Sequence, residues 1–402
     1  MSTNAIGVFI VIFAILAVIM VHEAGHFLTA KLFRFKATKF FLGFGPTLWS
    51  FHRGETEYGL KAIPAGGFVK IIGMNPYEEV APEDQPRSYP NKPKWQRALV
   101  VLAGPATHWV LAFFLLVGTV MTIGVESRTQ VTSQINAIQG VETSAGTVTT
   151  AAMESDLEPD DTIVAVDGRA TTSWREISEY IRTHAGEDVT FVVERDGAEE
   201  TIDVTLGKAI FDADGNPVEY SPPNEPIREA KAGEELVGFL GVEPSPVFEK
   251  YGLFEAVPKA GSMVGEFTVG SVRGVKTMFS EVFGGGLWEE LTKSGDRALD
   301  EETTFGIVGF VSFAGDSFAK GELFDLMMLI VGFTIIVGMM NLLPLPPLDG
   351  GHLAVLVIEA VTRKTVDVRR LIPIAAAVIA FFLVLFVAVL YLDIARPVQV
   401  DF

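Results

Sequence analysis

Four long apolar runs constrain the fold of this chain more than any other feature. They cover residues 5–21, 98–124, 323–343 and 371–392. A helix crosses the hydrocarbon core of a bilayer with about 20 consecutive apolar residues, so each run can span a membrane. Residues 1–4 carry no positive side chain, and no Ala-x-Ala site follows the first run before His22, so we expect this run to be a retained span. The runs predict a four-span helical membrane protein.

Charge is distributed unevenly among the segments that join these runs. Residues 31–97 carry 11 Lys and Arg against 6 Asp and Glu, whereas residues 121–320 carry 15 against 36. Because Lys and Arg concentrate in cytoplasmic loops, we expect 31–97 and 341–370 in the cytoplasm, and both termini and the acidic segment outside. The net charge of −19 argues against nucleic acid as a partner. The absence of Cys excludes disulfides and thiolate chemistry.

The first run ends in a group of ionisable residues, His22-Glu23-Ala24-Gly25-His26. If the helix continues, His22 and His26 share one face and can bind one divalent ion, with Glu23 beside it. Ionisable residues inside a span are costly and mark a function. With bound Zn²⁺ to activate water and Glu23 to accept its proton, the pattern predicts hydrolysis of an amide bond. Two imidazoles and a carboxylate also suit iron, although the position of Glu23 favours hydrolysis.

A third protein ligand is expected elsewhere at membrane depth, because catalytic zinc sites keep three. The strongest candidate is Asp349, which lies in a proline-broken segment after the third run. Prolines 344, 346 and 347 cannot continue a helix, and irregular backbone at membrane depth must be buried in protein or line a cavity. His352 is an alternative ligand.

These two elements together resemble the site-two protease family of intramembrane zinc metalloproteases, and specifically its bacterial, PDZ-containing subgroup that cleaves anti-sigma factors and signal-peptide remnants. The resemblance rests on His-Glu-x-x-His in the first span and on Asn-x-x-Pro-x-Pro-x-Leu-Asp-Gly from residue 341 onward. It implies His22, His26 and Asp349 as zinc ligands and Glu23 as the catalytic base. It also implies that Asn341 helps to hold the substrate backbone.

A β-hairpin is predicted in the first cytoplasmic loop, with strands over 47–51 and 56–63 around a turn at 52–55. In the family, a membrane-associated hairpin here is thought to offer its edge to an extended substrate. A purely structural hairpin is the alternative. The substrate-binding candidates that follow from this resemblance are Gly43, Gly45, Gly66, Gly67 and Phe68.

The second span contains a departure from the family pattern. The family's Gly-Pro-x-x-Asn corresponds to Gly104-Pro105-Ala106-Thr107-His108, so that His108 stands in place of the asparagine. A polar residue inside a span is a functional candidate. We expect a hydrogen-bonding, packing role for His108 in preference to direct contact with the metal.

The segment outside the membrane is predicted to contain a PDZ-like domain. Residues 151–168 resemble the bacterial PDZ signature, with Asp156 and Asp160 replacing two glycines. Such a domain binds an extended peptide C-terminus by strand addition, filters substrates by size, or acts as a spacer. An amphipathic run over 260–291 either lies on the membrane surface or packs against the protease core.

The expected fold class is an α-helical polytopic membrane protein of four spans with a membrane-associated β-hairpin and an inserted extracytoplasmic α+β PDZ-like domain. The protease core comprises residues 1–124 and 321–402, the PDZ-like domain 133–207, and an extracytoplasmic linker with the amphipathic run 208–320. The expected function is an intramembrane zinc endopeptidase acting on single-span membrane proteins in regulated intramembrane proteolysis. The expected partners are those substrates, the lipid bilayer and a peptide C-terminus.

Two rival functions belong to other classes. A membrane PDZ scaffold with a vestigial metal site would not need Glu23. A metal or solute transporter would explain the polar residues and broken helix at membrane depth, but no repeated or inverted segment pair is evident.

Overall fold

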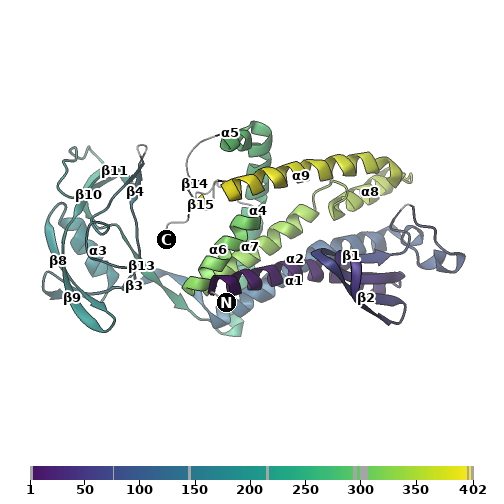
Figure 1. Cartoon of the computed structure of the whole chain (residues 1–402), viewed down its shortest axis with the longest axis horizontal. Helices are drawn as coiled ribbons and strands as arrows, with labels where there is room; N and C mark the ends of the chain where they lie inside the picture. Colours follow the sequence, from purple (N-terminus) through teal and green to yellow (C-terminus); the bar gives the residue numbers. More distant parts are fainter. Residues whose placement is uncertain are drawn as a thin grey trace. The chain divides into compact units, whose positions relative to one another are not determined.

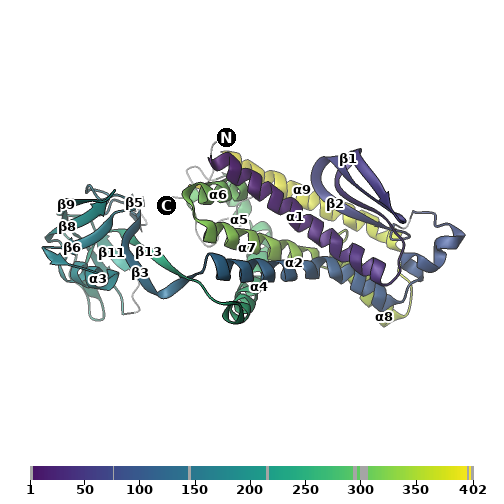
Figure 2. The same ribbon diagram turned by 90° about the horizontal axis from the view of Figure 1, so that it is seen from below.

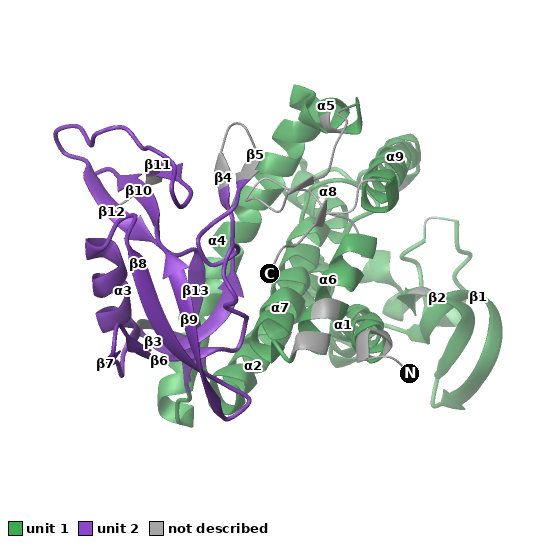
Figure 3. Cartoon of the chain, turned by 60° about the vertical axis from the view of Figure 1, so that its left-hand side comes forward, with its two compact units in different colours: residues 1–124, 250–400 green, residues 125–249, 401–402 purple. Residues whose placement is uncertain are grey.

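The computed structural model describes residues 3–75, 77–143, 146–213, 217–292, 297–298, 307–395 and 398–399. The chain forms two compact units, residues 1–124 with 250–400 and residues 125–249 with 401–402 (Figure 3). The first unit is mainly helical and the second is mainly β-sheet. The β-sheet unit is therefore an insertion into the helical one.

Four described helices are long and apolar enough to cross a membrane, over residues 6–32, 94–122, 323–341 and 369–395. They belong to α1 (Thr3–Leu32), α2 (Lys94–Thr122), α7 (Leu323–Asn341) and α9 (Ile372–Ala395) (Figure 1). In α9, only 6% of the most apolar stretch is buried by protein. A helix so apolar and so exposed requires lipid around it. The prediction of a polytopic membrane protein is confirmed.

Four further helices complete the described part of the helical unit. They are α4 (Leu253–Gly284), α5 (Gly286–Thr292), α6 (Ile307–Lys320) and α8 (Asp349–Thr362), with 3₁₀ turns η1 (Pro82–Arg87), η2 (Tyr89–Asn91) and η3 (Val368–Leu371). Most of the amphipathic run lies in α4, which packs against α2 and α7, and the end of the run lies in α5. Its Ala260 and Phe267 join the core cluster of Leu116 and Ile335, and Trp109 donates a hydrogen bond to Thr268 at 3.0 Å. Of the two expected placements, the structure has the packed one.

The predicted hairpin is present in the helical unit, with strands longer than expected: β1 (Ala37–Arg53) and β2 (Thr56–Ile71). Both strands bend, so that the first half of β1 has β2 on both sides. Phe41, for example, is paired with Phe68 on one side and with Gly59 on the other. Within the described part of the chain, residues 67–71 pair only with β1, so they form an edge of this small sheet.

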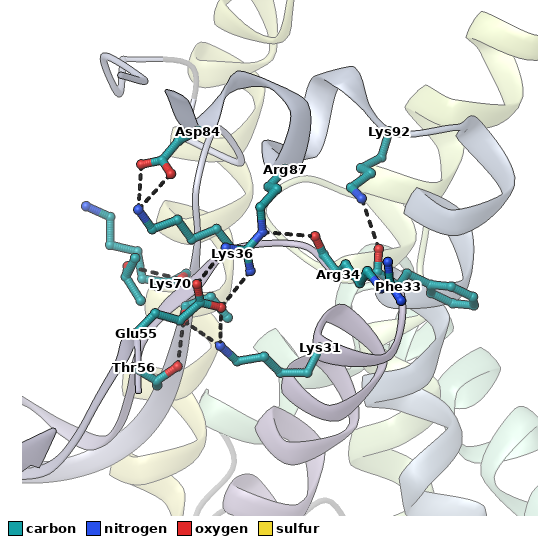
Figure 4. Close-up of polar contacts among 12 residues, drawn as sticks. Lys31, Phe33, Arg34, Lys36, Glu55, Thr56, Lys70, Asp84, Arg87 and Lys92 are labelled. Atoms are coloured by element: carbon teal, nitrogen blue, oxygen red, sulfur yellow. Dashed lines mark hydrogen bonds and ion pairs between the residues drawn. The ribbon is translucent and has the colours of Figure 1, made fainter. Parts of the chain in front are cut away.

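Polar contacts fix the hairpin turn to the end of α1 (Figure 4). The Glu55 carboxylate accepts hydrogen bonds from both Lys31 and Arg87 at 2.7 Å, and Lys36 pairs with Asp84 at 2.6 Å. The hairpin and α8 lie toward the same end of the helical unit, opposite the N-terminus (Figures 1 and 2). The two basic loops therefore share one end of the helices, as their charge predicts.

The β-sheet unit has a main sheet in the order β13-β3-β6-β8-β9, with β7 beside β6, and a smaller sheet in the order β11-β10-β12. Its core is built from Ile135, Ile163, Ile177 and Phe191. This unit spans 125–249, which is wider than the expected 133–207, because the strands at its two ends pair with each other. Its elements are β3 (Val125–Ile138), β4 (Val141–Thr143), β5 (Gly146–Val148), β6 (Thr162–Val166), β7 (Arg169–Ala170), α3 (Trp174–Thr183), β8 (Asp188–Arg195), β9 (Ala198–Thr205), β10 (Gly207–Phe211), β11 (Pro217–Ser221), β12 (Glu235–Phe239) and β13 (Val242–Glu249).

A short parallel pair, β14 (Arg297–Ala298) with β15 (Val398–Gln399), lies in the helical unit. The expected linker 208–320 is not one structural element. Residues 208–249 belong to the β-sheet unit, and α4 onward belongs to the helical unit.

Candidate metal centre

Three of the residues predicted to bind metal meet in the helical unit. His22 and His26 lie one turn apart on α1, and Asp349 is the first residue of α8. Asp349 Oδ2 is 3.2 Å from Nε2 of each histidine, and the two Nε2 atoms are 3.1 Å apart. Among the described residues, these three form the group able to hold a metal ion, and His352 is not part of it.

The spacing of the three donor atoms suits zinc. Zinc–nitrogen bonds of about 2.0–2.1 Å in tetrahedral geometry place neighbouring donors about 3.3 Å apart. The separations of 3.1–3.2 Å are close to that value. Two imidazole nitrogens and one carboxylate oxygen are also a common donor set of catalytic zinc.

Hydrogen bonding indicates that a cation belongs between these atoms. His26 Nδ1 lies 2.8 Å from the Val100 carbonyl oxygen, which can only accept, so Nδ1 carries the proton. In neutral His26, Nε2 then presents a lone pair toward Asp349 Oδ2 and His22 Nε2. Asp349 Oδ2 is buried and has no hydrogen-bond donor of good geometry in the described chain. Lone pairs that converge away from water repel one another, so a metal ion or a shared proton must lie among them.

Two glycines allow α1 and α2 to approach closely at the site. A Cβ atom on Gly104 would lie 2.2 Å from His26 Nε2, and one on Gly25 would lie 2.5 Å from the Ala103 carbonyl oxygen. Small residues at such crossings let helix backbones touch within a membrane. In the sequence Gly104 stands out as part of a family motif, and a glycine before a proline in mid-span is itself a signal of close helix contact.

Glu23, the predicted base, lies between the candidate metal ligands and the hairpin. A Cβ atom on Gly67 would be 3.2 Å from Glu23 Cγ, and the Val69 backbone hydrogen-bonds the Glu23 carboxylate. The carboxylate is also within electrostatic range of the three metal-site side chains. The structure thus brings Glu23 beside Gly67, a predicted substrate-binding residue.

The other predicted substrate-binding residues are placed as follows. Asn341 is the last residue of α7, just before the proline-containing turn that leads to Asp349. Gly43, Gly45 and Gly66 adopt positive φ angles of 87°, 84° and 136°, which favour glycine. Phe68 stacks on Phe41 at 5.7 Å and on Phe44 at 6.1 Å between ring centroids.

Comparison with known proteins identifies the family. The model of peptidase family M50 matches residues 10–386, a range that includes α1 and α8. The chain belongs to peptidase family M50. This agrees with the resemblance to site-two proteases, which is confirmed.

Two curated relatives illustrate the similarity of this M50 peptidase to named proteins. It is 31% identical over 375 residues to the zinc metalloprotease Rip1 of Mycobacterium tuberculosis, covering 90% of this chain and 88% of the relative. It is 32% identical over 350 residues to a putative zinc metalloprotease of Fusobacterium nucleatum, covering 86% of each. The similarity therefore includes both units of the M50 peptidase.

Proposed function

We propose that this M50 metalloprotease, with zinc as its cofactor, is an intramembrane endopeptidase. It hydrolyses peptide bonds within transmembrane segments of single-span proteins, such as anti-sigma factors or signal-peptide remnants, in regulated intramembrane proteolysis. One observation carries the proposal: His22, His26 and Asp349 converge beside Glu23 within a bundle of helices apolar enough to span a membrane. A peptidase built in this way meets its substrate inside the bilayer.

The proposed chemistry assigns a role to each side chain. His22 and His26 supply neutral nitrogen ligands, and Asp349 supplies one negative charge. Zinc, when bound, polarises the peptide carbonyl and activates water for attack. Glu23 accepts the proton of that water and delivers it to the leaving amine. The backbone hydrogen bond from Val69 holds the Glu23 carboxylate for these transfers.

A bound substrate has to be extended, because the hydrogen bonds of a helix protect its peptide bonds. The edge formed by residues 67–71 lies next to Glu23, as the position of Gly67 indicates. In our proposal a substrate strand pairs with this edge, and its scissile bond comes to the metal. Gly43, Gly45 and Gly66 shape the bends of the hairpin, Phe68 stiffens it, and Asn341 helps to hold the substrate backbone near the metal.

The role we propose for the β-sheet unit is to limit which proteins reach the membrane site. A cavity of about 790 Å³ lies between α3 and the β3 strand, lined by Trp174, Arg182 and Val131 among others. In a PDZ-like domain this groove accepts a peptide C-terminus. Because β3 already pairs with β13, which is the edge strand of this sheet, a peptide could add a strand only to β13. A steric filter, which needs no strand addition, is the alternative role.

The orientation that we propose follows from charge. The hairpin loop and the 341–370 loop face the cytoplasm, and both termini and the β-sheet unit lie outside. The site then lies nearer the cytoplasmic end of the spans, since His22 and His26 precede the end of α1 at Leu32.

The experiment that tests the proposal is cleavage of a panel of single-span fusion proteins by the purified full-length protein in detergent. Glu23→Gln should keep about one zinc per chain and lower kcat by about 10²- to 10⁴-fold, because only the base is lost. Glu199→Gln, an exposed carboxylate on β9, is the matched control and should cleave normally. Cleavage that survives in Glu23→Gln, or in the presence of a chelator, would refute the mechanism. Zinc binding by a wild type that cleaves no span would favour the scaffold.

A further inference from the structure

His108 of α2 is buried against the candidate metal centre, with only 1% of its surface exposed. Its Nε2 atom lies 3.0 Å from Nδ1 of His22. The other ring nitrogen of His22, Nε2, faces Asp349 and His26. His108 therefore contacts the side of the His22 ring that points away from the metal donors, and in this arrangement it is not a fourth ligand.

The contact with His108 concerns which ring nitrogen of His22 carries the proton. To bind a metal through Nε2, a neutral imidazole must carry its single proton on Nδ1, and that buried N–H needs an acceptor. His108 Nε2 is at hydrogen-bond distance to accept it. For His26, the acceptor of the Nδ1 proton is the Val100 carbonyl oxygen, at 2.8 Å. One ligand is thus oriented by backbone, and the other by a side chain that mutation can change.

The ring of His108 is itself held against α7. A Cβ atom on Gly338 would lie 2.7 Å from His108 Cβ and 2.9 Å from its Cγ, so the ring rests directly on the α7 backbone. The backbone of Thr334 on α7 also lies near the ring, although His108 Nδ1 makes no hydrogen bond of good geometry. The direction in which His108 presents Nε2 is therefore set by the packing of α2 on α7.

We propose that His108 is a positioning residue, which accepts the Nδ1 proton of His22 and so fixes the tautomer and ring orientation that present Nε2 to the metal. The inference rests on the proposed metal centre. Acceptors of this kind behind ligand histidines typically change metal affinity by about 10- to 100-fold.

The test measures zinc affinity of the purified full-length protein in detergent, by competition with a chromogenic chelator. His108→Leu keeps a side chain of similar size but removes the acceptor, and should weaken zinc binding by about tenfold or more. His108→Gln places an amide oxygen near the position of Nε2 and should restore affinity to within about threefold of wild type. His184→Leu, on the β-sheet unit, controls for the loss of a histidine and should leave zinc affinity unchanged.

A second readout separates orientation from folding. Thermal unfolding of the metal-free proteins should be similar for the Leu and Gln variants, while their zinc affinities differ. Wild-type affinity in His108→Leu, or equal losses in the Leu and Gln variants, would overturn the proposal. Zinc affinities that follow the prediction in a protein that cleaves no membrane span would refute the proposed protease function and leave the role of His108 intact.

Discussion

The carboxylate of Glu359 lies 3.3 Å from the guanidinium group of Arg97 and joins the last turns of α8 to the start of α2. Both side chains are nearly buried, at 6% and 13% exposed. Lys94 donates a hydrogen bond to the Glu359 carbonyl oxygen, and the Val366 amide donates to its carboxylate. Because α8 begins with Asp349, this pair anchors the helix that carries the third candidate ligand.

Removing one partner of this pair should be costly. Glu359→Leu leaves the Arg97 charge buried without its partner, and we expect a loss of about 3–5 kcal/mol in unfolding free energy. The double variant Arg97→Met/Glu359→Leu should recover much of that loss, because no unpaired charge remains. Denaturant unfolding in detergent measures both. A single variant as stable as wild type would show that water reaches the pair.

Gly104 should be intolerant of even one added methyl group. Gly104→Ala would place Cβ against His26 Nε2, so we expect zinc binding to fall below detection in equilibrium dialysis. Gly118→Ala is the matched control on α2, because its Cβ meets nothing within 4 Å. The control should bind zinc normally and gain up to about 1 kcal/mol in stability. Normal zinc binding by Gly104→Ala would mean that α1 and α2 can separate without disturbing the site.

A side chain at position 67 of the hairpin should disturb Glu23, the proposed base. Its Cβ position is 3.2 Å from Glu23 Cγ and 3.2 Å from the Phe41 carbonyl oxygen, so a large side chain must displace one of them. Gly67→Leu should lower kcat at least tenfold and leave zinc stoichiometry unchanged, as measured with a cleavable single-span fusion. His52→Leu, at an exposed position on β1 beside the turn, controls for general damage to the strands. Equal losses in both variants would refute the specific contact.

Glu55 should make a pH-dependent contribution to stability. Hydrogen bonds from Arg87, and further ones from Lys31, lower the pKa of Glu55 to about 2. A pKa that folding depresses adds stability above the unfolded value near 4.3, and that stability disappears as the pH falls toward 2. Glu55→Gln should therefore be less stable than wild type at pH 7, by about 1 kcal/mol or less for this partly exposed cluster. The two proteins should converge in unfolding titrations between pH 5 and 2, and a constant difference would contradict this assignment.

The sequence was sufficient to predict the four spans and the histidine pair because both depend on local patterns. A span is defined by length and apolarity, and His22 and His26 share a face because they are four residues apart. The sequence also indicated Asp349. However, it gave no measure of distance between α1 and α8, which are separated by more than three hundred residues.

Helix α8 was missed because two glycines follow Asp349 and indicate a turn. In the structure, Gly350 and Gly351 are helical, and their Cβ positions would lie 2.2 Å from the Leu342 carbonyl oxygen and 2.6 Å from the Pro346 nitrogen. These glycines serve close packing of α8 on the turn before it. The residue types alone do not show whether such a pair of glycines forms a turn or allows close packing of a helix.

Strand β13 is not predicted from the sequence, because Pro244 and Pro246 weaken any strand pattern. The strand forms by pairing with β3, which is more than one hundred residues away in sequence, and the prolines coincide with shifts in the β3 register. The limits of the β-sheet unit were therefore set by pairing that sequence patterns do not reveal.

Val125 and Glu249, the two ends of the inserted segment 125–249, pair with each other. The chain therefore enters and leaves the β-sheet unit at neighbouring positions. Within the helical unit, the Tyr251 amide donates to the Val120 carbonyl oxygen, so the ends of that unit are also neighbours. Evolution can consequently exchange, duplicate or delete this insert without rebuilding the helices. The role proposed for the insert, control of which proteins reach the site, would then be exchangeable by domain replacement while the helical bundle stays the same.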